Sequence, residues 1–123
     1  MAITKTVAVQ LGVTDGAFLT PTLSVSASAT QAGTDVVLQP FSVTTAWTAV
    51  NLGQCSPADW IMLVNRDATN YVQIAVDLTG TKIPFARLVP NGAPMVLPAD
   101  PTVTLYWKAN VAACLVTCLV TEP

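Results

Sequence analysis

The feature of the sequence that most limits its fold is a series of short runs in which apolar and polar residues alternate. Residues 22–29 read Thr-Leu-Ser-Val-Ser-Ala-Ser-Ala, and residues 71–77 place Val72, Ile74 and Val76 on one side of an extended chain. A period of two residues is typical of strands with one buried face. No long stretch has the apolar period of 3.6 residues that a helix requires, and nine prolines interrupt the chain. These features argue against long helices.

Runs of this kind recur along the whole chain and are separated by turn signals such as Thr79-Gly80 and Asn91-Gly92. The expected strands cover residues 3–11, 22–29, 36–48, 60–64, 71–77, 82–88, 102–108 and 113–121. The pattern predicts an all-β protein, either a β-sandwich or a jelly-roll-like barrel of about eight short antiparallel strands.

The chain of 123 residues fits one domain, so we expect a single domain over residues 1–123. Within it, residues 1–12 are a candidate N-terminal arm that adds a strand to a neighbouring molecule, with Ile3, Val7 and Val9 as its contact residues. The Ala/Ser/Thr/Gly stretch at 26–34 is either a mobile arm or loop, or a plain exposed strand and turn.

The chain is unusually poor in charge and rich in apolar residues, which bears on its partners. Charged residues make up 10% of the sequence and hydrophobic residues 52%, whereas an average soluble domain has about 25% charged residues. Either partners cover much of the apolar surface, or Ser, Thr, Asn and Gln cover it. The five basic residues are scattered, which disfavours nucleic-acid binding. No apolar run approaches the ~20 residues of a membrane span, and no signal peptide is evident.

The residues that usually carry catalysis are scarce. Histidine is absent, which removes the commonest general base and metal ligand. Most of the seven carboxylates have turn-like neighbours, so we expect them to cap turns. The loop from Asn65 to Asn70 offers oxygen atoms to a cation but lacks the pattern of a calcium loop, so we expect a hydrogen-bonded hairpin loop. These observations predict a protein that is not an enzyme and has no cofactor or metal.

The three cysteines are an odd number and a poor disulfide framework. On one strand, Cys114 and Cys118 would lie about 13 Å apart, too far for a disulfide. We expect Cys55, Cys114 and Cys118 to be buried or half-buried, reduced thiols.

The aromatic residues give two further expectations. Trp47 and Trp60 are expected in the core. Tyr106 and Trp107 are adjacent, so on a strand they point to opposite faces; either one of them faces solvent or a partner, or both faces are buried. Tyr71, Tyr106 and Trp107 are therefore candidate interface residues, since exposed aromatic side chains often anchor interfaces.

The second half of the chain resembles the small virion structural proteins of tailed bacteriophages. The resemblance lies in the order of three segments: Trp60-Ile61-Met62-Leu63-Val64-Asn65-Arg66-Asp67-Ala68-Thr69-Asn70-Tyr71-Val72-Gln73-Ile74, then Leu88-Val89-Pro90-Asn91-Gly92 with Met95-Val96-Leu97-Pro98, and last Val103-Thr104-Leu105-Tyr106-Trp107-Lys108-Ala109-Asn110 before a closing apolar strand. Asn91 departs from the pattern, in which proline and glycine are commonly adjacent. The resemblance implies a compact β-sandwich and a capsid decoration (cement) protein or a minor tail or neck protein.

These observations lead to three hypotheses. The first is a capsid decoration protein on the capsid exterior, trimeric, that clamps the major capsid protein together. The second is a neck, tail or baseplate component. The third is a module that binds carbohydrate or a host surface through Tyr71, Tyr106 or Trp107.

Overall fold

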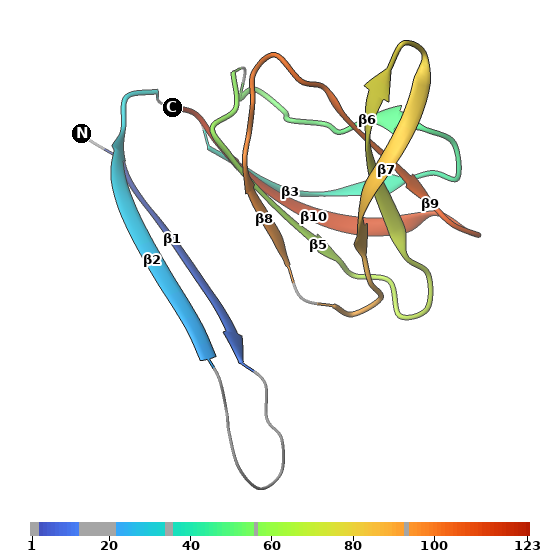
Figure 1. Ribbon diagram of the computed structural model, residues 1–123, viewed down its shortest axis with the longest axis horizontal. Helices are drawn as coiled ribbons and strands as arrows, with labels where there is room; N and C mark the ends of the chain where they lie inside the picture. The colour runs from blue at the N-terminus through green and yellow to red at the C-terminus, as the bar shows by residue number, and fades with distance from the viewer. Residues whose placement is uncertain (1–2, 13–21, 34–35, 56, 93) are drawn as a thin grey trace, which may run out of the picture. The chain divides into compact units, whose positions relative to one another are not determined.

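The computed structural model describes residues 3–12, 22–33, 36–55, 57–92 and 94–123, and every regular element in these ranges is a β-strand (Figure 1). The prediction of an all-β protein is therefore confirmed. The chain divides into two compact units, Met1–Thr34 and Asp35–Pro123. The described residues include no helix of the length and apolarity that a membrane-spanning segment needs.

The first unit contains a long antiparallel hairpin. Strand β1 (Ile3–Gly12) pairs with β2 (Thr22–Gln31) in a register that runs from Ile3 opposite Gln31 to Gly12 opposite Thr22. Within the predicted arm at 1–12, residues 3–12 form one strand of a hairpin, and residues 1–2 lie outside the described residues. Of the stretch at 26–34, residues 26–31 also belong to a strand, and residues 26–30 are exposed. This agrees with the second alternative for that stretch, a plain exposed strand and turn.

The second unit is a sandwich of two four-stranded antiparallel sheets. The first sheet has the order β3-β10-β5-β8 and the second the order β4-β9-β6-β7. The first contains β3 (Val36–Val43), β5 (Trp60–Asn65), β8 (Met95–Pro98) and β10 (Cys114–Thr121), which Figure 1 shows running side by side. The second contains β4 (Thr48–Ala49), β6 (Val72–Leu78), β7 (Thr81–Leu88) and β9 (Leu105–Ala109). Neither sheet closes into a barrel.

The core lies between the two sheets and follows the alternation of the strands. In β10 the burial of successive residues alternates along the whole strand, with Cys114, Val116, Cys118 and Val120 all at most 1% exposed. The second sheet contributes Ile74 and Trp107, among others, to this core. The remaining residues of the apolar core are Val43, Val50, Cys55, Ala58, Ile61, Leu63, Val72, Leu88 and Ala109. The three cysteines are reduced and buried, as predicted.

Trp107 is the aromatic centre of this core, and the structure corrects its assignment as an interface residue. It is 3% exposed, and its ring packs against Phe41 of the facing sheet with the centroids 6.1 Å apart. Trp107 points inward because it shares a face of β9 with Ala109, which is fully buried. Trp47 and Trp60, expected in the core, are only half-buried: Trp60 lies on the outer face of the first sheet, and Trp47 precedes β4 and lies beneath Lys108.

The loop between β5 and β6 is held by side-chain hydrogen bonds, as predicted, but it is not a hairpin loop, because β5 and β6 lie in different sheets and the loop crosses from one sheet to the other. Asn65 is buried; its Nδ2 donates to the backbone oxygens of Asn70 (2.8 Å) and Leu88 (3.1 Å). The Oδ1 of Asp67 accepts from the backbone nitrogens of Thr69 (2.8 Å) and Asn70 (2.6 Å). Because these N–H groups stabilise the carboxylate, they lower the pKa of Asp67.

Prolines lie on three of the strands at sheet edges. Pro40 is inside β3, Pro84 inside β7 and Pro98 ends β8. Pro40 lies within its strand, which is an edge strand of the first sheet. Since proline has no N–H, it disfavours the addition of a further strand at these edges. Contacts of the sandwich with other molecules are therefore easier to make through its faces.

Candidate interaction surfaces

The outer face of the first sheet is apolar across all four strands, and we call it the apolar face. One cross-strand row of it consists of Leu38, Leu119, Met62 and Val96, which are paired in register through β3, β10, β5 and β8. Leu38 is 68% exposed and Leu115 50% exposed. The other outward residues are Val36, Pro40, Ser42, Trp60, Val64, Pro98, Thr117 and Thr121.

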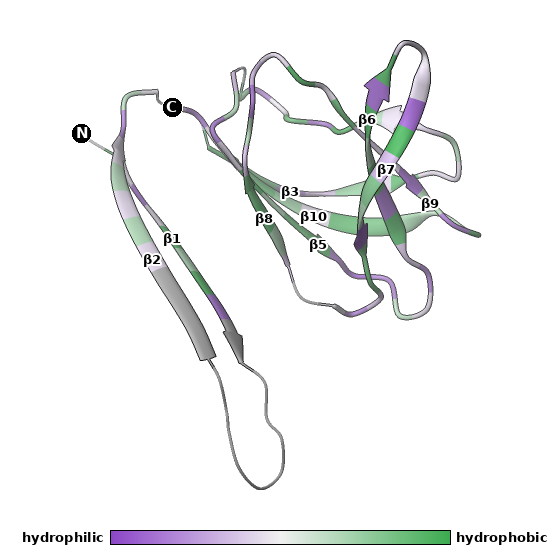
Figure 2. Ribbon diagram, in the orientation of Figure 1, coloured by the Kyte–Doolittle hydropathy of each residue, from purple (hydrophilic) through white to green (hydrophobic). Residues whose placement is uncertain are grey.

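None of these outward residues is ionisable. At the border of the face, the Nε of Arg66 donates to the Oγ1 of Thr117 at 3.2 Å. Figure 2 shows the hydrophobic colouring of β10, β5 and β8. Four strands spaced ~4.8 Å apart, with lengths of 8, 8, 6 and 4 residues, span roughly 400 Å² in projection. Patches of that size on a monomer are often functional.

The outer face of the second sheet has the opposite character, and we call it the cationic face. Three basic side chains each lie over an aromatic ring: Lys82 over Tyr106 at 4.2 Å, Arg87 over Tyr71 at 4.1 Å and Lys108 over Trp47 at 5.0 Å from the ring centroid. The sheet brings these pairs together because β9, β6 and β7 are neighbours. Such stacking fixes the position of an otherwise flexible cation.

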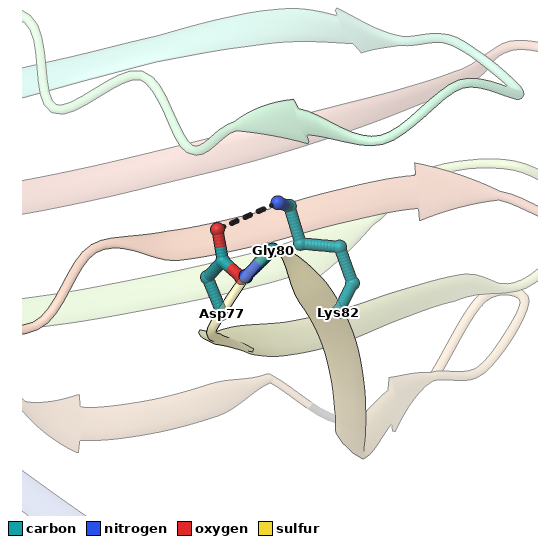
Figure 3. Close-up of polar contacts among 3 residues, drawn as sticks. All are labelled: Asp77, Gly80 and Lys82. Atoms are coloured by element: carbon teal, nitrogen blue, oxygen red, sulfur yellow. Dashed lines mark hydrogen bonds and ion pairs between the residues drawn. The ribbon is translucent and has the colours of Figure 1, made fainter.

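The three cations differ in their partners. Lys82 is paired with Asp77, whose Oδ2 lies 2.9 Å from the Lys82 Nζ, and the Oδ1 of Asp77 accepts from the backbone nitrogen of Gly80 at 2.9 Å (Figure 3). The hydrogen bond from Lys82 is the main cause of the lowered pKa of Asp77. Within the described part of the chain, neither Arg87 nor Lys108 pairs with a carboxylate.

A tight turn positions Asp77 and Lys82. The strands β6 and β7 are joined by Thr79 and Gly80, both with positive φ (49° and 89°), and Leu78 pairs directly with Thr81. Two residues of positive φ in a two-residue loop match the hairpin turn that suits the twist of paired strands. The turn places Asp77 opposite Lys82 in the ladder.

The structure brings some of the predicted interface residues together. Tyr71 and Tyr106 both lie on the cationic face, each half-buried beneath a cation. Ile3, Val7 and Val9 lie on one face of β1, which they share with Lys5, and Val9 is 50% exposed. The sequence did not predict the apolar face. Alternation predicts which residues of one strand share a face, but not that the faces of β3, β10, β5 and β8 join into one surface.

A pocket of about 360 Å³ opens between the sheets, lined mainly by apolar residues such as Val50, Leu52, Ile61, Leu97 and Leu105. Asp100 also lines it, but its Oδ1 accepts hydrogen bonds from the Oγ1 (2.6 Å) and the backbone nitrogen (2.8 Å) of Thr102. These bonds lower the pKa of Asp100, so the carboxylate serves the turn as an ionised cap. Among the described residues, no group of three or more potential metal ligands is found.

The thiols lie in surroundings that suppress their reactivity. Burial raises the pKa of Cys118 to about 12. Burial also raises the pKa of Cys114, with a further contribution from the charge of Asp67. Because the thiolate is the reactive form of cysteine, these side chains act as small apolar groups of the core.

Comparisons of the chain with protein-family models, with curated proteins and with solved structures give no match.

Proposed function

We propose that this protein is a non-enzymatic structural protein of a bacteriophage particle, a capsid decoration (cement) protein that stabilises the shell of major capsid protein by surface contact. The observation that carries the proposal is the apolar face. Leaving the exposed side chains of Leu38 and Leu115 in water sacrifices roughly 25 cal/mol for each Å² that a partner would cover. In a subunit of an assembly, a partner covers such a face and removes this cost.

The size of the apolar face favours an assembly with several contacts per subunit. A stable pair of proteins buries about 800 Å² on each partner, and the apolar face spans roughly half of that in projection. A homotrimer on the capsid exterior, bound to the major capsid protein, supplies the remaining area through repeated contacts. The long hairpin of β1 and β2 fits this arrangement, since isolated two-stranded hairpins are marginally stable and gain from a partner.

The assignment to a virus particle rests on the resemblance of residues 60–122 to small phage virion proteins. The non-enzymatic part rests on the sequence, which lacks histidine, and on the turn-capping hydrogen bonds of Asp67, Asp77 and Asp100.

The first experiment is quantitative mass spectrometry of purified particles, which gives the copy number of this protein relative to the major capsid protein. Hundreds of copies per particle are expected for a decoration protein. A few to a few dozen copies would transfer it to the neck, tail or baseplate, and absence from the particles would refute a virion role.

A matched pair of variants tests the apolar face itself. Leu38→Lys places a charge on that face, whereas Leu78→Lys makes the same change at a similarly exposed leucine (62%) at the end of β6. We expect Leu38→Lys to abolish binding of recombinant protein to particles stripped of it, and Leu78→Lys to bind normally. Equal binding of both variants would contradict the assignment of this face.

A second candidate function is a module that binds carbohydrate on a host surface. It is favoured by one observation, namely that Tyr71 and Tyr106 lie on the same face. A glycan-binding screen with the full chain distinguishes it from the first.

A further inference from the structure

The middle of the cationic face contains one cross-strand row that no function stated so far explains. Gln73 on β6 pairs in register with Arg87 on β7 and with Lys108 on β9. The two cations therefore flank a side-chain amide on adjacent strands, with their Cα atoms about 10 Å apart, which is twice the strand spacing. All three side chains point outward, since their neighbours Val72, Ile74 and Trp107 are buried.

Aromatic rings hold the two cations in place. The guanidinium of Arg87 lies 4.1 Å from the centroid of the Tyr71 ring, and the ammonium of Lys108 lies 5.0 Å from the centroid of the Trp47 ring. A cation that is already ordered loses less conformational entropy when it binds an anion. A guanidinium stacked on a ring also keeps its N–H groups free at its edge, where they can donate two parallel hydrogen bonds to a carboxylate.

The charge of this row is not compensated locally. Asp77 is the carboxylate on the same face, and it is paired with Lys82 at 2.9 Å. Within the described residues, Arg87 and Lys108 have no ion pair. The row is therefore a local surplus of two positive charges on a chain whose net charge is −2.

We propose that the row Lys108–Gln73–Arg87 binds carboxylate side chains of an acidic patch on a protein partner. The composition favours a protein, because tyrosine, tryptophan and arginine are the residues enriched at the centres of protein interfaces. The broad outer surface of a sheet also suits a protein partner. This inference rests on the proposed function, since it gives the sandwich a second contact in the particle, besides the apolar face, with an acidic protein surface.

The test uses the full chain and a fluorescently labelled poly-L-glutamate as the acidic polypeptide, with binding followed by fluorescence anisotropy at low and at physiological salt. The double variant Arg87→Gln/Lys108→Gln removes two charges from the row. The control Lys5→Gln/Arg66→Gln removes two charges elsewhere and leaves the net charge of the two variants equal. Circular dichroism checks the fold of each variant.

We expect the unmodified chain to bind polyglutamate, with an affinity that falls as salt is added. The row variant should bind at least about tenfold more weakly, since two charge-assisted contacts are lost. The control should stay within about twofold. Arg87→Lys, which keeps the charge but not the planar fork, should lie between them.

Three results would overturn the inference: no binding of polyglutamate, an equal loss in the row variant and the control, or a preference for dextran sulfate, which would assign the row to polyanionic glycans. None of them alters the copy number in particles. Conversely, absence of the protein from particles would refute the proposed function, whereas the binding of polyglutamate by the row would still stand as a result.

Discussion

Replacement of Asn65 tests whether one buried amide joins the two sheets at the end of β5. The side chain is 2% exposed. Its Nδ2 donates to the oxygens of Asn70 and Leu88, and its Oδ1 accepts from the nitrogen of Asp67 at 3.0 Å. Leu88 ends β7 in the other sheet. The amide is therefore a direct polar link between β5 and β7, in a core that is otherwise apolar.

The cost of Asn65→Ala follows from these three bonds. Each hydrogen bond contributes about 1 kcal/mol net, and a buried group left without a partner costs about 1–3 kcal/mol. The nitrogen of Asp67 lies near the surface and can bind water, whereas the oxygen of Leu88 loses its partner in the interior. We expect the free energy of unfolding to fall by about 3–4 kcal/mol, a large part of the ~5–15 kcal/mol of a typical domain.

Asn65→Asp gives a sharper test, because it changes the charge but not the shape. The new Oδ2 would face the oxygens of Asn70 and Leu88, which repels the ionised form and raises the pKa of this carboxyl above its unfolded value. A raised pKa means that stability is retained below the unfolded pKa and lost as the pH rises through the folded pKa. Relative to the unmodified chain at the same pH, Asn65→Asp should be more destabilised at pH 7 than at pH 4.

Urea unfolding followed by tryptophan fluorescence measures these differences. Asn51→Ala is the matched control, since Asn51 is exposed and its Oδ1 accepts a single bond from the nitrogen of Gly53 at 2.8 Å. We expect the control to cost no more than about 1 kcal/mol. A cost of Asn65→Ala as small as that of the control, or an Asn65→Asp variant that is least stable at pH 4, would refute the reasoning.

Three further predictions concern the core and the turns. Trp107→Ala should lower the free energy of unfolding by about 3–5 kcal/mol, because it removes the ring that packs on Phe41; a loss under 1 kcal/mol in urea unfolding would contradict its place in the core. The Cys118 thiol, with a pKa of about 12, should not react with a chromogenic disulfide reagent at pH 8 until the chain unfolds, and its labelling rate under native conditions checks this. Asp67 has a lowered pKa, so its contribution to stability is present above the unfolded pKa of about 3.9 and is lost as the pH falls through the folded pKa. Thermal unfolding between pH 6 and pH 2 should therefore show a weaker acid dependence for Asp67→Asn than for the unmodified chain, and identical profiles would count against the capping role.

Local alternation was enough to predict most strands. The expected strand at 113–121 differs from β10 by one residue at its start, because Cys114, Val116, Cys118 and Val120 repeat every second residue. Strand β8 was not predicted as a strand: it is four residues long, with Pro94 before it and Pro98 at its end. Prolines normally interrupt strands, so β8 is a strand only because β5 offers it a partner.

The surfaces were harder to predict than the strands. The sequence predicts that Tyr106 and Trp107 face opposite sides, and the apolar residue Leu105 on the side of Trp107 was the signal that Trp107 is the inward one. No such signal connects Arg87 with Tyr71 or Lys108 with Trp47, because strands that are distant in sequence bring these residues together. The apolar face depends on the order β3-β10-β5-β8, which alternation cannot supply.

That strand order also determines when the sandwich can form during synthesis. Strand β10 lies between β3 and β5, which have no ladder with each other. Until residues 114–121 have emerged from the ribosome, β3 has no partner in its sheet and β5 pairs with β8 alone. The half-made chain must therefore keep the apolar sides of β3 and β5 from premature association, and non-local pairing of this kind folds slowly. Closure of the sheet is a late event that follows translation of its central strand.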